Sequence, residues 1–274
     1  MKGKTVILNI AFGKNPYCRK RHFLPIAAGA SRKDILTDAE GEDNISNKNK
    51  SYGDFTALYW AWKHLKDVNI FGISHYRRYI ADADYLKPGT YVMRWWQFRM
   101  CRYSVKQFEN DLRKYDFIMT QSYRMDCSVY EHYVKNHPYP KNIEITTEAL
   151  RKIHPDCVDI WENYLAGNEW INGYIFVTHW TYFCQLMEWL YPVLEEIEKH
   201  IDVDDFNGYQ SRVIGYLYER LVPVFLKRYN FSIKEYGLYY IETEKYHSPL
   251  YLKWKNSKWW KYLREKYYCF LKKV

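Results

Sequence analysis

The sequence predicts an α/β fold with a largely parallel central sheet flanked by helices. Residues 5–12 (TVILNIAF) and 68–74 (VNIFGIS) are short apolar runs, as expected of strands buried on both faces. Between them, the apolar residues of 52–65 recur three and four positions apart, which predicts an amphipathic helix. A helix between two buried strands is the βαβ pattern of a parallel sheet with crossover helices.

The other elements are predicted from the same alternation of apolar runs and polar connections. Pro25 and Gly29 punctuate a short second element, and the polar residues 38–50 (DAEGEDNISNKNK) predict a loop. Further strands are predicted at 115–121 and 171–178, and further helices around 148–165, at 182–199 and at 209–228. We expect one α/β domain over residues 1–249, followed by a basic aromatic tail over 250–274.

The composition excludes several classes of protein. With 47% hydrophobic and 27% charged residues, the chain can bury a core and is neither disordered nor collagen-like. Its 6 cysteines include no C-x-x-C pair, which favours free thiols over disulfides or a zinc site. No apolar stretch reaches the roughly 18 residues of a membrane span, and the first apolar run is too short for a signal peptide. We therefore expect a cytoplasmic protein.

The positive charge is concentrated near the C-terminus. Residues 250–274 contain eight basic residues and one acidic residue, so they carry +7 of the net charge of +9. The rest of the chain is nearly neutral, whereas a nucleic-acid binder more often spreads its basic residues over a folded face. The charge distribution therefore argues against nucleic acid as a partner.

A cluster of basic residues directly follows the predicted strand 68–74. In open α/β sheets, ligands bind beyond the carboxyl ends of the strands. His75, Arg77 and Arg78 stand at such an end, and paired guanidinium groups suit a diphosphate. The alternative is that these arginines pair with surface carboxylates on a solvated turn.

Two further segments are candidates for ligand or metal binding. Asp82 and Asp84 have the D-x-D form by which many sugar-nucleotide enzymes hold Mn²⁺ or Mg²⁺ against a diphosphate. If Arg77 and Arg78 neutralise the diphosphate themselves, no metal is required. Asn44 and Asn47 precede the helix 52–65, where they either contact a polar ligand or serve as ordinary capping residues.

Long stretches of the chain resemble a bacterial family. Five stretches are similar to a domain-of-unknown-function family from capsular and exopolysaccharide gene clusters. They are residues 25–31 (PIAAGAS), 43–65, 71–80 (FGISHYRRYI), 171–199 and 209–221. Characterised members are glycosyltransferases, some of which use UDP-galactofuranose. The resemblance covers roughly residues 5–228 and implies a GT-A-like nucleotide-sugar-binding fold. In one departure, Gly173-Tyr174 stands where the family usually has Met-Phe.

The resemblance suggests roles for single residues. It places His75, Arg77 and Arg78 where GT-A enzymes bind the donor diphosphate, and it places Asn172 where similar enzymes contact the acceptor sugar. Arg212 is about two helical turns before Glu219, roughly on the same helix face, and we expect it to contact the acceptor. An inverting transfer needs a carboxylate base, for which Glu219 and Asp84 are candidates. A structural Arg–Glu network would explain Glu219 equally well.

The basic tail suggests where such an enzyme would work. Taken as a helix, residues 255–273 place aromatic and leucine side chains on one arc and mostly lysines on the other. We expect this tail to bind anionic lipid at the inner face of the plasma membrane, unless it packs on its own domain or on a dimer partner. The expected activity is transfer of a sugar from a UDP donor to a lipid-linked glycan. The alternative is a non-catalytic module that binds carbohydrate or nucleic acid.

Overall fold

The computed structural model describes residues 3–82, 89–100 and 103–242. By its internal contacts the chain divides into two units, Met1–Ile241 and Glu242–Val274. Its strands are β1 (Lys4–Ala11), β2 (Phe23–Ala27), β3 (Leu36–Thr37), β4 (Val68–His75), β5 (Arg78–Ile80), β6 (Thr90–Arg94), β7 (Phe117–Thr120), β8 (Tyr123–Arg124), β9 (Glu169–Trp170), β10 (Phe176–His179), β11 (Ile233–Tyr236) and β12 (Leu238–Glu242).

The helices alternate with these strands along the chain. The α-helices are α1 (Asn49–Tyr52), α2 (Phe55–His64), α3 (Trp95–Met100), α4 (Lys106–Asp111), α5 (Val129–Asn136), α6 (Lys141–Ile153), α7 (Val158–Ala166), α8 (Trp180–Glu198) and α9 (Val213–Arg228). Short 3₁₀ helices lie at η1 (Ala28–Ala30), η2 (Ser46–Lys48), η3 (Pro155–Cys157), η4 (Val203–Asp205) and η5 (Gly208–Arg212). The predicted α/β class is confirmed.

The central sheet is mostly parallel, as predicted. Its main path runs β11-β7-β10-β4-β1-β2-β3. β1 pairs in parallel with β2 and β4, and β7 pairs in parallel with β11. β10 is inserted antiparallel between β4 and β7. The parallel strands β1, β2 and β4 therefore end at the same edge of the sheet, where an α/β fold typically binds its ligand.

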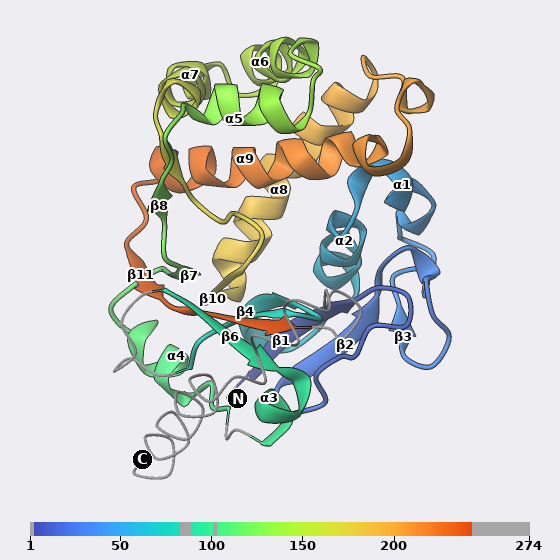
Figure 1. Ribbon diagram of the computed structural model, residues 1–274, viewed down its shortest axis with the longest axis vertical. Coiled ribbons are helices and arrows are strands. Elements are labelled where there is room, and N and C mark those ends of the chain that lie inside the picture. Colours follow the sequence, from blue (N-terminus) through green and yellow to red (C-terminus); the bar gives the residue numbers. More distant parts are fainter. Residues whose placement is uncertain (1–2, 83–88, 101–102, 243–274) are drawn as a thin grey trace, which may run out of the picture. The chain divides into compact units, whose positions relative to one another are not determined.

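Both faces of the sheet are covered, which explains why its strands are continuous apolar runs. Successive side chains of a strand point to opposite faces. Leu8 and Phe176 join the larger core, whereas their neighbours Ile7 and Val177 join the smaller one. In Figure 1 the helices α1, α2 and α5–α9 lie on one side of the sheet, and α3 and α4 lie on the other.

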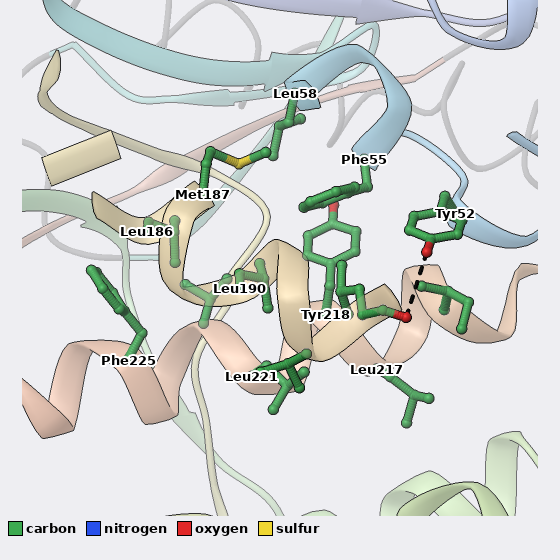
Figure 2. Close-up of a cluster of buried hydrophobic side chains, with 14 of the residues drawn as sticks. Tyr52, Phe55, Leu58, Leu186, Met187, Leu190, Leu217, Tyr218, Leu221 and Phe225 are labelled. Atoms are coloured by element: carbon green, nitrogen blue, oxygen red, sulfur yellow. Dashed lines mark hydrogen bonds between the residues drawn. The ribbon is translucent and has the colours of Figure 1, made fainter. Parts of the chain in front are cut away.

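The larger core is packed between α2, α8 and α9. Figure 2 shows Phe55 and Leu58 of α2 together with Leu190 of α8 and Leu221 of α9. Phe55, Leu190 and Leu221 are almost completely buried. At about 25 cal/mol per Å² of apolar surface, each such side chain contributes roughly 1.5–3 kcal/mol. This packing fixes α9, which carries part of the site described below.

Two predicted helices are each interrupted, one at a glycine and the other at a proline. The helix predicted over 52–65 breaks at Gly53, whose φ of 59° is in the left-handed region. The helix predicted around 148–165 is two helices, α6 and α7, because Pro155 lacks the amide hydrogen that would continue the ladder. Both predictions gave the helical character correctly but missed the break.

Three other predicted boundaries also need correction. The strand predicted over 171–178 begins only at Phe176, because residues 171–175 form turns that approach α9. The helix predicted over 209–228 opens with the 3₁₀ turn η5, which begins at Gly208 with its φ of 56°. The loop predicted over 38–50 ends in η2 and the start of α1. In each case tertiary contacts or a glycine overrode the local pattern.

Candidate active site

A polar cavity of about 480 Å³ lies at the carboxyl ends of β1, β2 and β4. Ile10, Ala28 and His75 mark these strand ends in its lining. Further lining comes from the α1–α2 junction, the β4–β5 turn, β8, α5 and its end, residues 170–174, η5 and the first half of α9. The cavity therefore occupies the position at which an open α/β sheet binds its ligand.

The basic cluster predicted after β4 lies in this cavity. His75, Arg77 and Arg78 all line it. The guanidinium carbon of Arg77 lies 5.3 Å from the Tyr76 ring centroid, and that of Arg78 lies 5.8 Å from the ring of Tyr174. Within the described ranges neither arginine forms an ion pair, and Nε of Arg77 is buried without a hydrogen-bond partner. These two positive charges are thus available to an anionic ligand rather than paired with surface carboxylates.

Asp54 joins this cluster, although the sequence did not single it out. Its Oδ2 lies 3.2 Å from Nε2 of His75, and its Oδ1 accepts a 2.9 Å hydrogen bond from the hydroxyl of Tyr218. The left-handed Gly53 ends α1 and directs the chain so that Asp54 enters the cavity. Burial lowers the pKa of His75, and the nearby Asp54 carboxylate opposes that shift. In the sequence, the only indication of this role for Asp54 is that a Gly-Asp pair stands directly before an amphipathic helix.

Glu219 reaches the same cavity from α9. Burial, reinforced by the negative charge of Asp54, raises the pKa of its carboxyl group to about 8. Arg220 and Arg78 oppose this shift. The Glu219 carboxylate accepts no hydrogen bond from any residue that the structure describes. It is therefore an unengaged carboxylate that can exchange a proton near neutral pH.

The neighbouring Arg220 is buried and held by contacts with aromatic rings and the backbone. Its side chain is 2% exposed, and its guanidinium carbon lies 4.8 Å from the Tyr133 ring centroid and 4.9 Å from that of Trp170. Nη1 donates a 2.7 Å hydrogen bond to the carbonyl of Tyr216. Cation–π contacts with these two rings hold Arg220 in the cavity lining, where it adds positive potential.

Both residues expected to contact the acceptor line the cavity. The amide of Asn172 accepts a hydrogen bond from Nε1 of Trp170 (2.8 Å) and donates one to Oγ1 of Thr120 (2.9 Å). Arg212 is exposed, with its guanidinium 5.4 Å from the Phe12 ring centroid. A side chain at Gly173 would place Cβ 2.5 Å from the carbonyl oxygen of Glu219. This glycine therefore allows the 172–174 segment to approach α9 closely.

The structure places Asn44 and Asn47 outside the cavity lining. The amide nitrogen of Asn44 donates to the carbonyl of Gly41 (2.7 Å), and its oxygen accepts from the amide of Ser46 (3.2 Å). Asn47 is exposed in η2. The two asparagines thus shape the loop, and Asn49, two residues further on, lines the cavity instead.

A buried carboxylate in that loop was also missed by the sequence pattern. Asp38 is fully buried and accepts hydrogen bonds from the amides of Gly29 (2.8 Å) and Ala30 (3.2 Å). It also accepts from the hydroxyls of Ser46 (2.7 Å) and Thr56. Asp38 therefore ties the segment after β2 to η2 and α2, which carry the rim of the cavity.

The expected D-x-D metal site receives no support from the described half of the motif. Asp82 accepts hydrogen bonds from the amide of Ser104 (2.6 Å) and the hydroxyl of Tyr239 (3.3 Å), and it does not line the cavity. Asp84 lies outside the described residues, so its expected role as a base stays a prediction. Among the described residues no group of three or more His, Cys, Asp or Glu side chains is arranged to hold a metal. The described residues around Asp82 thus do not form a cation site.

The basic tail over 250–274 also lies outside the described residues, so its membrane role and the domain boundary at 249 stay predictions. Within the described ranges, no helix has the length and apolar character that crossing a bilayer requires.

Comparison with known proteins gives the class of fold and then the family. The chain superposes on the apo structure of the bifunctional glycosyltransferase WbbM with a TM-score of 0.77 and 18% identity. The match covers 88% of this chain and 46% of WbbM, so the chain spans just under half of that protein's length. This likeness confirms the glycosyltransferase-type α/β fold that the sequence resemblance implied.

The chain belongs to the family described as domain of unknown function DUF4422, which matches residues 7–230. The resemblance found in the sequence is thereby confirmed. No curated protein matches the chain.

Proposed function

We propose that this chain is a glycosyltransferase that transfers a sugar from a UDP-sugar donor, such as UDP-galactofuranose, to a lipid-linked glycan. The observation that carries this proposal is the single cavity that joins Arg77 and Arg78 to the carboxyl groups of Asp54 and Glu219. A binding module needs the cations or the rings of such a site, but it has no use for an unengaged carboxylate with a raised pKa. The shared fold with WbbM, itself a glycosyltransferase, supports the same reading.

The two arginines are proposed to bind the donor diphosphate. Sugar transfer breaks the bond between the anomeric carbon and the diphosphate oxygen, which leaves with the electron pair. Arg77 and Arg78 present permanent charges and forked donors that stabilise this developing negative charge. His75, held by Asp54 at 3.2 Å, supports the turn on which both arginines stand. No metal ion is needed for this charge neutralisation.

Glu219 is proposed to act as the general base of an inverting transfer. Its carboxylate removes the proton of the acceptor hydroxyl while that oxygen forms the new bond to the anomeric carbon. Asp54 is less suited to this task, because both of its oxygens are already engaged by Tyr218 and His75. Asn172 and Arg212, which line the same cavity, are proposed to orient the acceptor.

The pathway and the cellular location are proposed from the family resemblance and from the charge of the tail. We assign the reaction to assembly of a capsular polysaccharide, exopolysaccharide or O-antigen on a lipid carrier. The +7 tail would hold the enzyme on the inner face of the plasma membrane, where that acceptor is exposed. This places the protein in the cytoplasm as a peripheral membrane enzyme.

A panel of UDP-sugars tests the proposal. Release of UDP from each donor is measured with the wild type and with Glu219→Gln, which keeps the size of the side chain but cannot accept a proton. We expect at least one donor to be turned over, and we expect the variant to retain UDP binding while its turnover falls about 10²–10⁴-fold. Equal turnover by both proteins would remove Glu219 from the reaction. Failure of UDP to bind the wild type would overturn the proposed donor.

A further inference from the structure

Part of the cavity lining is a stack of rings contributed by α5, η5 and α9. The imidazole of His137, at the end of α5, lies 3.9 Å from the Tyr216 ring centroid, with an interplanar angle of 22°. Tyr209 of η5 lies near both rings, 6.1 Å from His137 and 5.1 Å from Tyr216. Tyr209 is 65% exposed, whereas His137 and Tyr216 are buried. His137 and Tyr216 therefore pack against Tyr209, and much of the Tyr209 ring stays accessible in the cavity lining.

Hydrogen bonds fix which nitrogen of His137 carries the proton. The amide nitrogen of Gln210 donates a 2.9 Å hydrogen bond to the carbonyl of Asn136, so the other amide atom, which faces His137, is the oxygen. That oxygen lies 2.9 Å from Nδ1 of His137 and can only accept a hydrogen bond. Nδ1 must therefore be protonated, which leaves Nε2 of the neutral ring as an acceptor.

The imidazoles in this part of the lining are neutral at physiological pH. Burial lowers the pKa of His137 to about 4, opposed by the hydrogen bond to Gln210 and reinforced by the charge of Arg220. Burial, together with the charges of Arg220 and Lys135, also lowers the pKa of His132. Nδ1 of His132 is buried and has no hydrogen-bond partner among the described residues. The two imidazoles thus offer uncharged polar atoms beside the rings, while Arg212 and Arg220 line the same part of the cavity.

A stack of rings beside neutral hydrogen-bonding atoms suits a sugar ring. A sugar ring presents an apolar face of C–H groups that can stack on an aromatic ring, and its edge carries hydroxyl donors. We infer that Tyr209 and His137 form the acceptor subsite, in which Tyr209 stacks on a neutral sugar residue and Nε2 of His137 accepts a hydrogen bond from one of its hydroxyls. This inference rests on the proposed function and deepens it, because it makes the acceptor a neutral glycan end rather than the lipid carrier itself.

Saturation-transfer NMR on the full chain tests the subsite directly. The probes are the methyl glycosides of galactose, glucose, mannose and rhamnose, each added to protein saturated with UDP. We expect transfer to the ring protons of at least one glycoside, and we expect Tyr209→Ala to weaken its binding about fivefold. Tyr209→Phe, which keeps the ring, should restore binding. Tyr130→Ala is the matched control, because Tyr130 is another exposed tyrosine (41%), on α5, and does not line the cavity.

The outcomes separate this inference from the proposed function. Unchanged glycoside binding in Tyr209→Ala, or no transfer to any of the four probes, would overturn the subsite even if UDP binds with full affinity. Loss of glycoside binding in Tyr130→Ala as well would also overturn it, because the effect would then not belong to the stack. Glycoside binding that depends on Tyr209 in a protein that does not bind UDP would support the subsite and defeat the proposed donor.

Discussion

Glu219, the proposed general base, has an energetic cost for the fold. The folded-state pKa of its carboxyl group is about 8, against an ordinary value of 4.5. Between these two values the folded chain binds more protons at this site than the unfolded chain, so the free energy of unfolding falls as pH rises from 4.5 to 8. Asp54 on the α1–α2 junction faces Glu219 with like charge, and Arg78 and Arg220 face it with opposite charge.

This cost predicts opposite effects of one substitution on stability and on activity. Glu219→Gln should raise the free energy of unfolding above pH 8, by up to roughly 3 kcal/mol, while lowering turnover about 10²–10⁴-fold. Wild-type kcat/KM should rise with pH up to about pH 8, because the base acts only when deprotonated. Urea unfolding at pH 5 and pH 9 measures the first effect, with the exposed Glu162→Gln as control. A flat pH profile, or a variant no more stable than the control at pH 9, would contradict this account of Glu219.

Asp82 carries the prediction on metal dependence. Its carboxylate is occupied by Ser104 and Tyr239, and two unpaired arginines are available to neutralise the diphosphate. We therefore expect EDTA to leave most activity in place and Asp82→Asn to have a mild effect. Activity measured with EDTA and then with added Mn²⁺ or Mg²⁺ decides this. Complete loss that either cation restores would favour a D-x-D metal site that uses Asp84.

At the scale of elements, Asp38 connects the segments that form the cavity rim. Replacing a buried carboxylate that accepts four hydrogen bonds leaves its donors unpaired. Asp38→Asn should therefore lower the free energy of unfolding by about 2–4 kcal/mol. Asp34→Asn is the matched control, because the Asp34 side chain is 54% exposed. Equal stability of the two variants in urea would show that Asp38 does not tie η1, η2 and α2 together.

The sequence predicted best those elements whose pattern is local. β1 and β4 are apolar runs ended by polar residues, and their positions imply that His75, Arg77 and Arg78 stand at a strand end. The strand β10 was predicted but its antiparallel direction could not be, because the direction of a strand depends on the whole path of the chain. Asp54 could not be ranked above other loop acids, because its partner Tyr218 is 164 residues away in the sequence.

Asn44 and Asn47 were predicted to bind a ligand from a pattern that does not distinguish a ligand loop from an ordinary one. A run of Asn, Asp and Ser before a helix is the pattern of a ligand loop and equally that of a loop closed by its own side chains. Here Asn44 is used for closure, and the buried Asp38 holds the segment in place. Only the three-dimensional contacts distinguish the two cases.

At the scale of the whole molecule, the basic tail and the cavity are separate in sequence. The arginines proposed to bind the donor precede residue 79, whereas the +7 segment begins at residue 250. Deletion of 250–274 should therefore release the protein from anionic vesicles and leave UDP affinity nearly unchanged. Vesicle cosedimentation should also weaken as salt rises, because the attraction acts over about one Debye length. A folded truncated protein that still binds these vesicles would place the membrane contact elsewhere, and one that unfolds would show that the tail packs on its domain.

Titration calorimetry of UDP is the most direct test of the central claim that the cavity binds a nucleotide-sugar diphosphate. Wild type should bind UDP and not a short oligonucleotide. Arg77→Ala and Arg78→Ala should each lose roughly 1.5–3 kcal/mol of binding free energy, the contribution of a charge-assisted hydrogen bond. The exposed Arg113→Ala, outside the cavity, should bind as the wild type does. Unchanged UDP affinity in both cavity variants, with their folds intact, would contradict the claim.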